Sequence, residues 1–153
     1  MKVKENKKSP TFSLDSTTLK TFDSRKIKGG LVVYFYPRDN TPGCTLETKD
    51  FTKLYKKFKS LSFEVVGISK DNIKSHLSFK KKYNVPVELL SDEKTIVLKK
   101  YKAWGLKKFL GKEYYGIIRS TVLINEKGKI VKTWSNVRVK DHVKNVINEL
   151  SNI

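Results

Sequence analysis

One stretch of the chain, residues 34–47, holds the residue types and the spacing that could do chemistry. An apolar run ends there in a loop, and the loop brings the only cysteine of the sequence, Cys44, to the expected start of a helix. Helix N-termini carry partial positive charge and free N–H groups, which favour a thiolate. Such positions, like cationic neighbours, lower a cysteine pKa from about 8.5 to roughly 3.5–7.5. The sequence therefore predicts a reactive thiol at Cys44.

The residues around Cys44 exclude several classes of cysteine chemistry. Taken alone, a single cysteine is more often a small buried apolar residue than a nucleophile. A Cys-x-x-Cys redox motif is absent because Thr41 holds the partner position, and residues 45–50 lack the arginine of a phosphatase-like loop. A cysteine hydrolase needs a histidine base, but His76 and His142 fall in expected helices, where we interpret them as surface or helix-face residues. Zinc sites need several Cys or His ligands, so neither a metal nor another cofactor is expected.

Length and composition favour one soluble globular domain. The 153 residues are expected to fold as a single domain over residues 1–153, with residues 1–9 as a short basic lead-in. A single cysteine allows no intramolecular disulfide and favours a reducing compartment. The sequence has no apolar run near the roughly 18 residues of a membrane span, and its N-terminus lacks a secretory signal. We therefore expect a cytoplasmic or nuclear protein without membrane contact.

The net charge of +18 is high, and lysines occur along the whole chain. No block of five or more basic residues forms a tail of the kind that binds nucleic acid. We interpret the charge as a lysine-rich solvated surface. Nucleic acid, if bound, would be contacted through phosphates and without base readout.

Hydrophobic patterning predicts an α/β fold, a sheet with helices on both faces. The expected strands cover residues 11–14 and 19–22 as an edge hairpin, 31–36, 63–68, 87–90, and 120–124 with 130–134 as a second hairpin. The expected helices cover residues 44–59, 71–83 capped by Asp71, 93–103, and a last one from about residue 140. The second helix is expected to face inward with Ile73, Leu77 and Phe79. The last helix is expected to carry one apolar stripe, formed by Val139, Val143, Val146, Ile147 and Leu150. Residues 104–115 are expected to form a loop. Trp104 and Trp134 are expected to pack, with Trp104 also a candidate for the active-site mouth.

The spacing Pro37-x-x-x-Thr41-x-x-Cys44 is the active-site signature of the peroxiredoxins, and the sequence resembles that family. The resemblance is closer to the bacterioferritin-comigratory-protein, or peroxiredoxin Q, subfamily. It extends roughly from residue 10 to residue 150. The matching segments are residues 34–45, 89–93, 116–121 and 134–137.

This resemblance implies a thioredoxin-like fold with a central mixed sheet, and a thiol-dependent peroxidase active in antioxidant defence. In such an enzyme the Cys44 thiolate attacks hydrogen peroxide or an alkyl hydroperoxide and becomes a sulfenic acid. Arg119 matches the family's active-site arginine, which holds the thiolate and offers donors to the peroxide. The Thr41 hydroxyl accepts a hydrogen bond from the peroxide and donates one to the sulfur. Pro37 shields the thiolate from water, and Glu47 orients the arginine.

The sequence departs from the subfamily at one position. Many members carry a second, resolving cysteine five residues after the first, where this chain has Lys49. We therefore expect a one-Cys enzyme, a monomer whose oxidised Cys44 is reduced by an external thiol such as thioredoxin, glutaredoxin or glutathione. Two alternatives stay open: a basic protein of this fold associated with nucleic acid, and a redox sensor without fast turnover.

Overall fold

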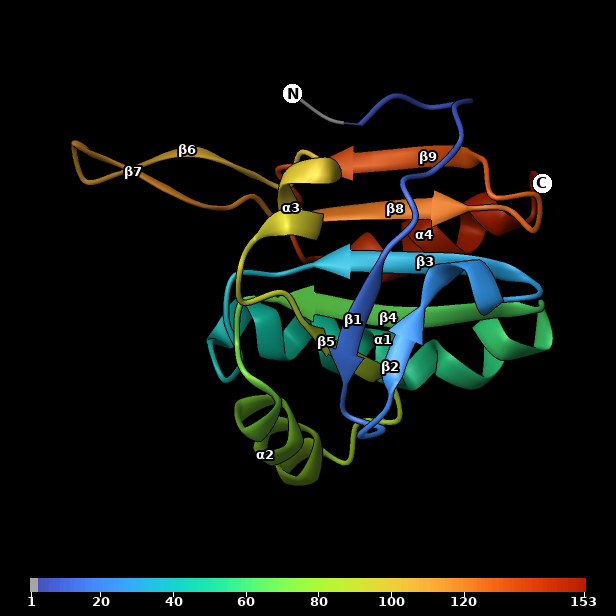
Figure 1. Ribbon diagram of the computed structural model, residues 1–153, viewed down its shortest axis with the longest axis horizontal. Helices are drawn as coiled ribbons and strands as arrows, with labels where there is room; N and C mark the ends of the chain where they lie inside the picture. Colours follow the sequence, from blue (N-terminus) through green and yellow to red (C-terminus); the bar gives the residue numbers. More distant parts are fainter. Residues whose placement is uncertain (1–2) are drawn as a thin grey trace.

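The computed structural model describes residues 3–153, and its main feature is a seven-stranded mixed sheet (Figure 1). The strands are β1 Ser13–Ser16, β2 Thr21–Asp23, β3 Gly30–Phe35, β4 Phe63–Ser69, β5 Glu88–Ser91, β8 Ser120–Ile124 and β9 Ile130–Ser135. Their order is β2-β1-β5-β4-β3-β8-β9, with β3, β4 and β5 parallel and the other pairs antiparallel. β6 Trp104–Phe109 and β7 Lys112–Ile117 form a separate hairpin. The helices are α1 Pro42–Ser60, α2 Ile73–Tyr83, α3 Ile96–Lys100 and α4 His142–Leu150, with a short 3-10 helix η1 Ser24–Lys26.

The central strand β3 is buried on both faces, as its continuous apolar sequence predicts. Successive side chains of a strand point to opposite faces. Leu31, Val33 and Phe35 therefore enter one core cluster, while Val32 and Tyr34 enter the other. The strand is fixed from both sides, and so is the loop that follows it.

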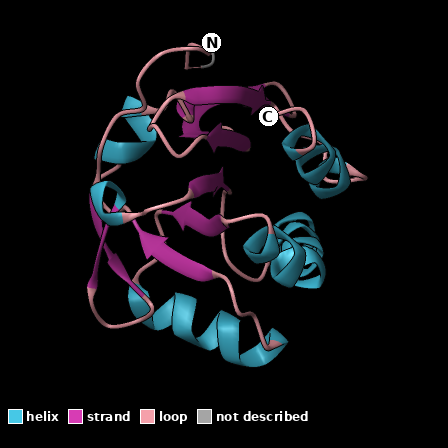
Figure 2. Ribbon diagram, turned by 90° about the vertical axis from the view of Figure 1, so that its right-hand side faces the viewer, coloured by secondary structure: helices cyan, strands magenta, loops and turns pink. Residues whose placement is uncertain are grey.

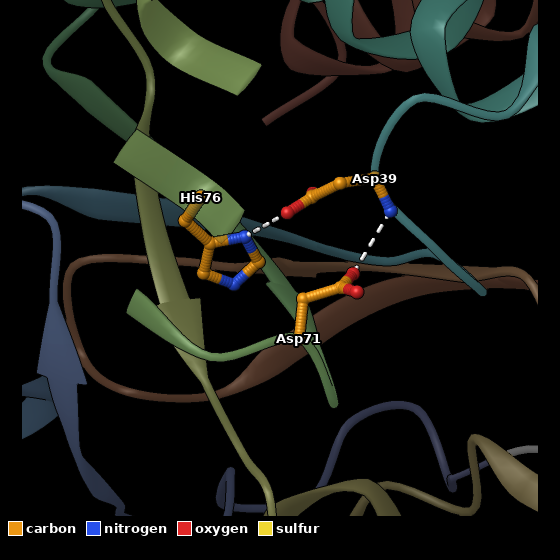
Figure 3. Close-up of side chains that lie close together, drawn as sticks. All are labelled: Asp39, Asp71 and His76. Atoms are coloured by element: carbon orange, nitrogen blue, oxygen red, sulfur yellow. Dashed lines mark hydrogen bonds and ion pairs between the residues drawn. The ribbon is translucent and has the colours of Figure 1, made fainter. Parts of the chain in front are cut away.

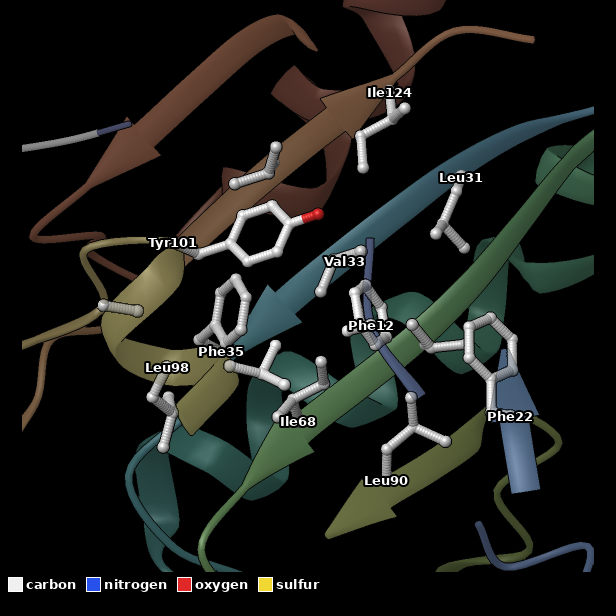
Figure 4. Packing of buried hydrophobic residues seen from close by; sticks show 14 of the residues in the cluster. Phe12, Phe22, Leu31, Val33, Phe35, Ile68, Leu90, Leu98, Tyr101 and Ile124 are labelled. Carbon is white, nitrogen blue, oxygen red and sulfur yellow. The ribbon is translucent and has the colours of Figure 1, made fainter. Parts of the chain in front are cut away.

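Helices cover both faces of the sheet, which confirms the predicted layering. α1, α2 and α4 supply Phe51, Phe79 and Val146 to the core cluster on one face. α3 supplies Val97 and Leu98 to the other cluster, where Figure 4 shows Leu98 among aromatic and aliphatic side chains from the sheet. In Figure 2 the strands run between helices on two sides. Among residues 3–153 no helix has the length and apolar character needed to cross a membrane.

Two segments far apart in sequence meet at one edge of the sheet. β8 runs antiparallel to β3, and its first residue, Ser120, pairs with Phe35 at the end of β3. The residue before Ser120 therefore lies beside the loop that leads from β3 into α1. This register brings Arg119 towards Cys44.

The edge hairpin and α1 form where they were predicted, with shifted boundaries. The strands of the edge hairpin begin two residues later than the expected 11–14 and 19–22. α1 begins at Pro42, two residues before Cys44, because Thr41 is its N-cap. Proline suits the first turn of a helix, where its missing N–H costs no hydrogen bond.

The predicted cap and inward face of α2 are partly wrong. Asn72, not Asp71, caps the helix, its side chain accepting a hydrogen bond from the Ser75 N–H at 2.8 Å. Phe79 is buried as predicted, but Leu77 is exposed. The helix is therefore rotated about its axis relative to the prediction. This rotation determines which side chains of α2 face the active-site loop.

The helix predicted over residues 93–103 is shorter than expected. α3 begins at Ile96 because Thr95, with φ 61°, has a left-handed backbone that a helix cannot include. The second predicted hairpin and the apolar stripe of the last helix are both confirmed, with α4 beginning at His142.

The prediction of a loop over residues 104–115 is wrong. β6 and β7 pair over six residues, and their turn is Leu110-Gly111, where both residues have positive φ. Such two-residue turns match the twist of a hairpin. The hairpin was not predicted because its sequence lacks the alternation of apolar and polar residues that a half-buried strand shows.

Replacing Phe51 with alanine should test the packing of α1 on the sheet. The Phe51 ring is fully buried and stacks on Tyr34 with a centroid separation of 4.4 Å. Phe51→Ala is expected to lower the free energy of unfolding by about 3–5 kcal/mol, measured by urea denaturation. Leu46→Ala, on the exposed side of the same helix, should change it by less than about 0.5 kcal/mol. Equal losses in the two variants would contradict this packing.

Candidate active site

Cys44 lies in the first turn of α1, and its side chain is buried, with 1% exposed. The carbonyl of the N-cap Thr41 accepts the first helical hydrogen bond, from Thr45 N–H at 2.8 Å. The partial positive charge of a 19-residue helix is therefore directed at the thiol. The structure places Cys44 at a helix start, as the sequence predicts.

The guanidinium of Arg119 lies between Cys44 and Glu47. Its Nη2 donates a hydrogen bond to Cys44 Sγ at 3.2 Å, and its Nη1 donates to Glu47 Oε1 at 2.7 Å. Arg119 comes from the link between β7 and β8, and only 16% of its side chain is exposed. Arginine stays protonated in proteins, so a fixed positive charge faces the sulfur. Three of the five predicted site residues are thus in direct contact.

Gly43 allows this close approach, and sequence reasoning missed its role. A Cβ atom at position 43 would lie 3.2 Å from Arg119 Nη2. That spacing is too tight for an unstrained contact between a methyl group and a guanidinium. Glycine therefore leaves the room in which Arg119 lies against the start of α1.

Glu47 is fully buried and only half satisfied. Its Oε1 accepts from Arg119, while Oε2 has no hydrogen-bond partner among the described residues. Burial raises the pKa of Glu47 from 4.5 to about 7, and the Arg119 cation only partly offsets this. Keeping the Glu47 carboxylate ionised beside Arg119 therefore lowers the stability of the folded protein.

Thr41 and Pro37 lie in the loop before α1. The Thr41 hydroxyl donates to the Arg38 carbonyl at 2.8 Å, so its proton is not directed at the sulfur as predicted. Its oxygen lone pairs remain available to accept a hydrogen bond. Pro37 is half-buried directly after the end of the apolar run and has no N–H to offer to the site.

The second histidine, His142, is buried near Arg119, and its predicted surface position is wrong. Its Nε2 lies 2.8 Å from Thr121 Oγ1, and its ring packs edge-on against Trp134. Burial, with a smaller effect of the Arg119 cation, lowers the pKa of His142 to about 4. The ring is therefore neutral at neutral pH. Trp134 and Trp104 each pack against a core cluster, which confirms the prediction that they are packing residues.

A second buried network fixes the loop from the side of α2 (Figure 3). The Asp39 backbone N–H donates to Asp71 Oδ2 at 2.8 Å. Both carboxylate oxygens of Asp39 accept hydrogen bonds: Oδ1 from Tyr36 at 2.6 Å, and Oδ2 from Ser75 at 2.8 Å. His76 Nδ1 also lies 2.8 Å from Asp39 Oδ2. Asp39 stands five residues before Cys44, so this network holds the loop that positions the thiol.

The two ring nitrogens of His76 each lie close to an oxygen atom that can accept a hydrogen bond. The ring is fully buried, and its Nε2 lies 3.0 Å from the Leu90 carbonyl oxygen, which can only accept. Asp39 Oδ2 already accepts from Ser75 and is likewise an acceptor for Nδ1. Both ring nitrogens thus lie within hydrogen-bonding distance of acceptor oxygens, an arrangement that a doubly protonated ring beside the Asp39 carboxylate would satisfy. The predicted surface position of His76 is wrong.

Asp39, Asp71 and His76 could in principle hold a metal ion, since one ligand atom of each lies within 4.8 Å of the others. Hydrogen bonds already use these atoms, however: Asp71 Oδ2 accepts from Asp39 N–H and from Ser69. A metal would have to replace the whole network. The geometry therefore supports an ion pair that anchors the loop.

Sequence reasoning missed Asp39 and His76 because they lie 37 residues apart and share no motif. One signal was present: His76, Phe79 and Tyr83 have the spacing of one helix face. Phe79 is buried, and a histidine three residues before it would share its environment. The choice of Leu77 for the inward face concealed this.

Comparison with known proteins agrees with the geometry of the site. The family described as AhpC/TSA matches residues 6–133. The chain belongs to the AhpC/TSA family. Peroxiredoxin Bcp of Bacillus subtilis (strain 168) is 39% identical, covering 100% of this chain and 98% of that protein. The putative peroxiredoxin bcp of Coxiella burnetii is 40% identical, covering 98% and 100%.

Solved structures of peroxiredoxins have the same fold. Peroxiredoxin Q of Xanthomonas campestris superposes with a TM-score of 0.87 at 33% identity, covering 92% of this chain and 90% of that one. Peroxidoxin BcpB of Mycobacterium tuberculosis gives 0.86 at 27% identity, covering 100% and 98%. The fold is thioredoxin-like and the chain is a thiol-dependent peroxidase, as the sequence resemblance implied.

The cysteine content separates this peroxiredoxin from that of Xanthomonas campestris, for which two different cysteine-to-serine variants have been solved. This chain has one cysteine. Lys49 stands where many members of the subfamily carry the second, resolving cysteine. It lies on the exposed side of α1, with its ammonium 5.3 Å from the ring centre of Tyr83 on α2. That position contributes packing between two helices.

Replacing Glu47 with glutamine should separate stability from activity. The folded pKa of Glu47 lies above its unfolded value, so its contribution to stability is lost as pH rises from about 4.5 through about 7. Glu47→Gln is therefore expected to gain stability relative to the parent over that range, measured by urea denaturation at pH 5 and pH 8. Peroxide reduction should fall at least about tenfold, because Arg119 loses its anionic partner. A glutamine variant less stable than the parent at pH 8 would show that the ion pair outweighs the burial.

We expect the two histidines of the chain to differ in charge at neutral pH. We expect nitrogen NMR of the ring atoms at pH 7 to show His76 with protons on both nitrogens and His142 as a neutral ring. His142 serves as the internal control, because its pKa of about 4 keeps it neutral until strong acid. A neutral His76 ring at pH 7 would contradict the hydrogen-bond assignment.

Proposed function

We propose that this peroxiredoxin is a one-Cys peroxidase in which Cys44 reacts, Arg119 and Thr41 bind the peroxide, Pro37 limits water, and Glu47 positions Arg119. The observation that carries the proposal is the Arg119 guanidinium, which bridges a buried sole cysteine and a buried carboxylate at 3.2 and 2.7 Å. A cation held there stabilises the thiolate. Its N–H groups also lie where negative charge develops as the peroxide bond breaks.

In the first step the Cys44 thiolate attacks the terminal oxygen of a hydroperoxide. A sulfur–oxygen bond forms and the oxygen–oxygen bond breaks, so that sulfur is oxidised to a sulfenic acid. The peroxide is reduced: its other oxygen leaves as hydroxide or alkoxide and takes a proton from water, which gives water or an alcohol. Hydrogen peroxide and alkyl hydroperoxides both fit this scheme, and a solved Xanthomonas campestris relative is described by its alkyl peroxide reduction.

In the second step an external thiol restores the enzyme. Its sulfur attacks the Cys44 sulfenic acid, which gives a mixed disulfide and water. A second thiol then attacks the external sulfur and releases the Cys44 thiolate. Thioredoxin, glutaredoxin and glutathione supply such thiols. A monomer in a reducing compartment such as the cytoplasm suits a single cysteine that forms no disulfide of its own.

Cys44→Ser should abolish peroxide consumption, because no other residue of the chain is a thiol. After one equivalent of hydrogen peroxide, mass spectrometry of the parent should find one added oxygen, or a mixed disulfide if a thiol is present, at Cys44. Thr45→Ser, a conservative change at the neighbouring position, should keep the activity. An unmodified Cys44 after peroxide treatment would overturn the proposal.

A further inference from the structure

The β6–β7 hairpin exposes more large apolar side chains than any other element of the described chain. It projects from the body on the side where β3 ends and α1 begins (Figure 1). Five of the eleven large exposed hydrophobic residues belong to it, with 46% to 87% of each exposed: Leu106, Phe109, Leu110, Tyr114 and Tyr115. In the register of the hairpin, Leu106 and Tyr115 share one face, while Phe109 and Tyr114 share the other. Exposed apolar side chains gathered on one element in this way mark a candidate interaction site.

The turn at the tip of the hairpin contains a residue type that such turns disfavour. Leu110 has φ 51° and is 87% exposed. A turn with positive φ at both positions favours asparagine or glycine, and water favours a polar side chain. A bulky apolar residue satisfies neither condition. Positions that break local rules in this way concentrate at functional sites.

The base of the hairpin is joined to the active site. Ile118 N–H donates to the Ala103 carbonyl at 2.8 Å, and Lys107 Nζ donates to the Ile117 carbonyl at 2.8 Å. β7 ends two residues before Arg119, which contacts Cys44. A molecule bound at the base of the hairpin would therefore lie close to Arg119 and Cys44.

We propose that the β6–β7 hairpin is the docking surface for an acidic protein dithiol that reduces oxidised Cys44, an inference that rests on the proposed one-Cys peroxidase. Lys107, Lys108 and Lys112 outnumber the single acidic residue, Glu113, so the surface is apolar and positively charged. An acidic surface with apolar contacts is complementary to it. Tyrosine and phenylalanine are the side chains that most often anchor such contacts.

The other possible occupants fit less well. A second copy of this chain would bring the same net charge of +18 and be repelled. Nucleic acid would use the aromatic rings and the lysines, but it would leave the apolar Leu106 and Leu110 unburied and it supplies no reductant for Cys44. The chemistry requires a reductant, and Cys44 is only 1% exposed. A protein dithiol must therefore contact the surface around Cys44 while its sulfur forms the mixed disulfide.

The test measures the two half-reactions separately by stopped flow. Parent and variants are oxidised with one equivalent of hydrogen peroxide and then mixed with reduced thioredoxin or with dithiothreitol. The variant Phe109→Thr/Leu110→Asn removes apolar surface and supplies a residue that suits the turn. We expect it to slow reduction by thioredoxin roughly tenfold, with oxidation by peroxide and reduction by dithiothreitol unchanged. Lys108→Glu should slow the thioredoxin reaction as well and weaken its dependence on salt.

Matched controls exist elsewhere on the surface. Leu19, in the turn between β1 and β2, is 77% exposed with φ 64°, so Leu19→Asn makes the same change away from Cys44. Lys127→Glu reverses an exposed charge in the turn between β8 and β9, at the opposite end of the sheet. Both should leave every rate unchanged.

Three results would overturn the inference. One is an unchanged thioredoxin rate in the hairpin variants, and another is an equal loss with dithiothreitol, which would place the effect at Cys44 itself. The third is a hairpin-dependent dimer or DNA complex in sedimentation, with no change in the thioredoxin rate. Failure of peroxide to oxidise Cys44 in the parent would instead refute the proposed function, so the two failures are distinguishable.

Discussion

The structure depends on placing one buried cation, Arg119, between the Glu47 carboxyl group and the Cys44 sulfur. A guanidinium taken out of water is costly unless its partners are close and well oriented. Glu47 supplies one partner and Cys44 the other, both from the first two turns of α1. The antiparallel register of β3 with β8 makes this possible, because it places the residue before Ser120 beside the end of β3. The central sheet thus determines the active site.

The loop that carries Thr41 is held between two buried ion pairs. Arg119 with Glu47 fixes the start of α1, and His76 with Asp39 fixes the middle of the loop against α2. Buried polar pairs seldom add stability compared with apolar packing. The two pairs instead fix the geometry of the loop. The attack of the sulfur on a peroxide requires the reacting atoms to be held in a fixed orientation.

The sequence predicted what depends on local pattern and on a short motif. β3 is recognisable from its continuous apolar run, and the start of α1 from the proline and cysteine that follow Thr41. The motif also brought in Arg119, which no argument from periodicity connects with Cys44. The β6–β7 hairpin was missed because hairpins are recognised by alternating polarity, and this one exposes aromatic and apolar residues in place of polar ones. The His76–Asp39 pair was missed because it arises from tertiary packing of α2 against the loop. Neither feature follows from the local patterns on which the sequence predictions rest.

The high net charge contributes little to the reactivity of Cys44. At 3.2 Å, with the effective dielectric constant of about 20 near a protein surface, one unit charge stabilises another by about 5 kcal/mol. A lysine about 15 Å away across water, at physiological salt, contributes less than about 0.1 kcal/mol. Arg119, in contact with the sulfur, therefore contributes far more than a distant lysine, while the nearer Lys107 adds to its effect. Peroxides are neutral and are not attracted by the charge of +18, whereas an acidic protein is. The lysine-rich surface can thus affect the encounter with a partner, the step that a chain with one cysteine cannot complete alone.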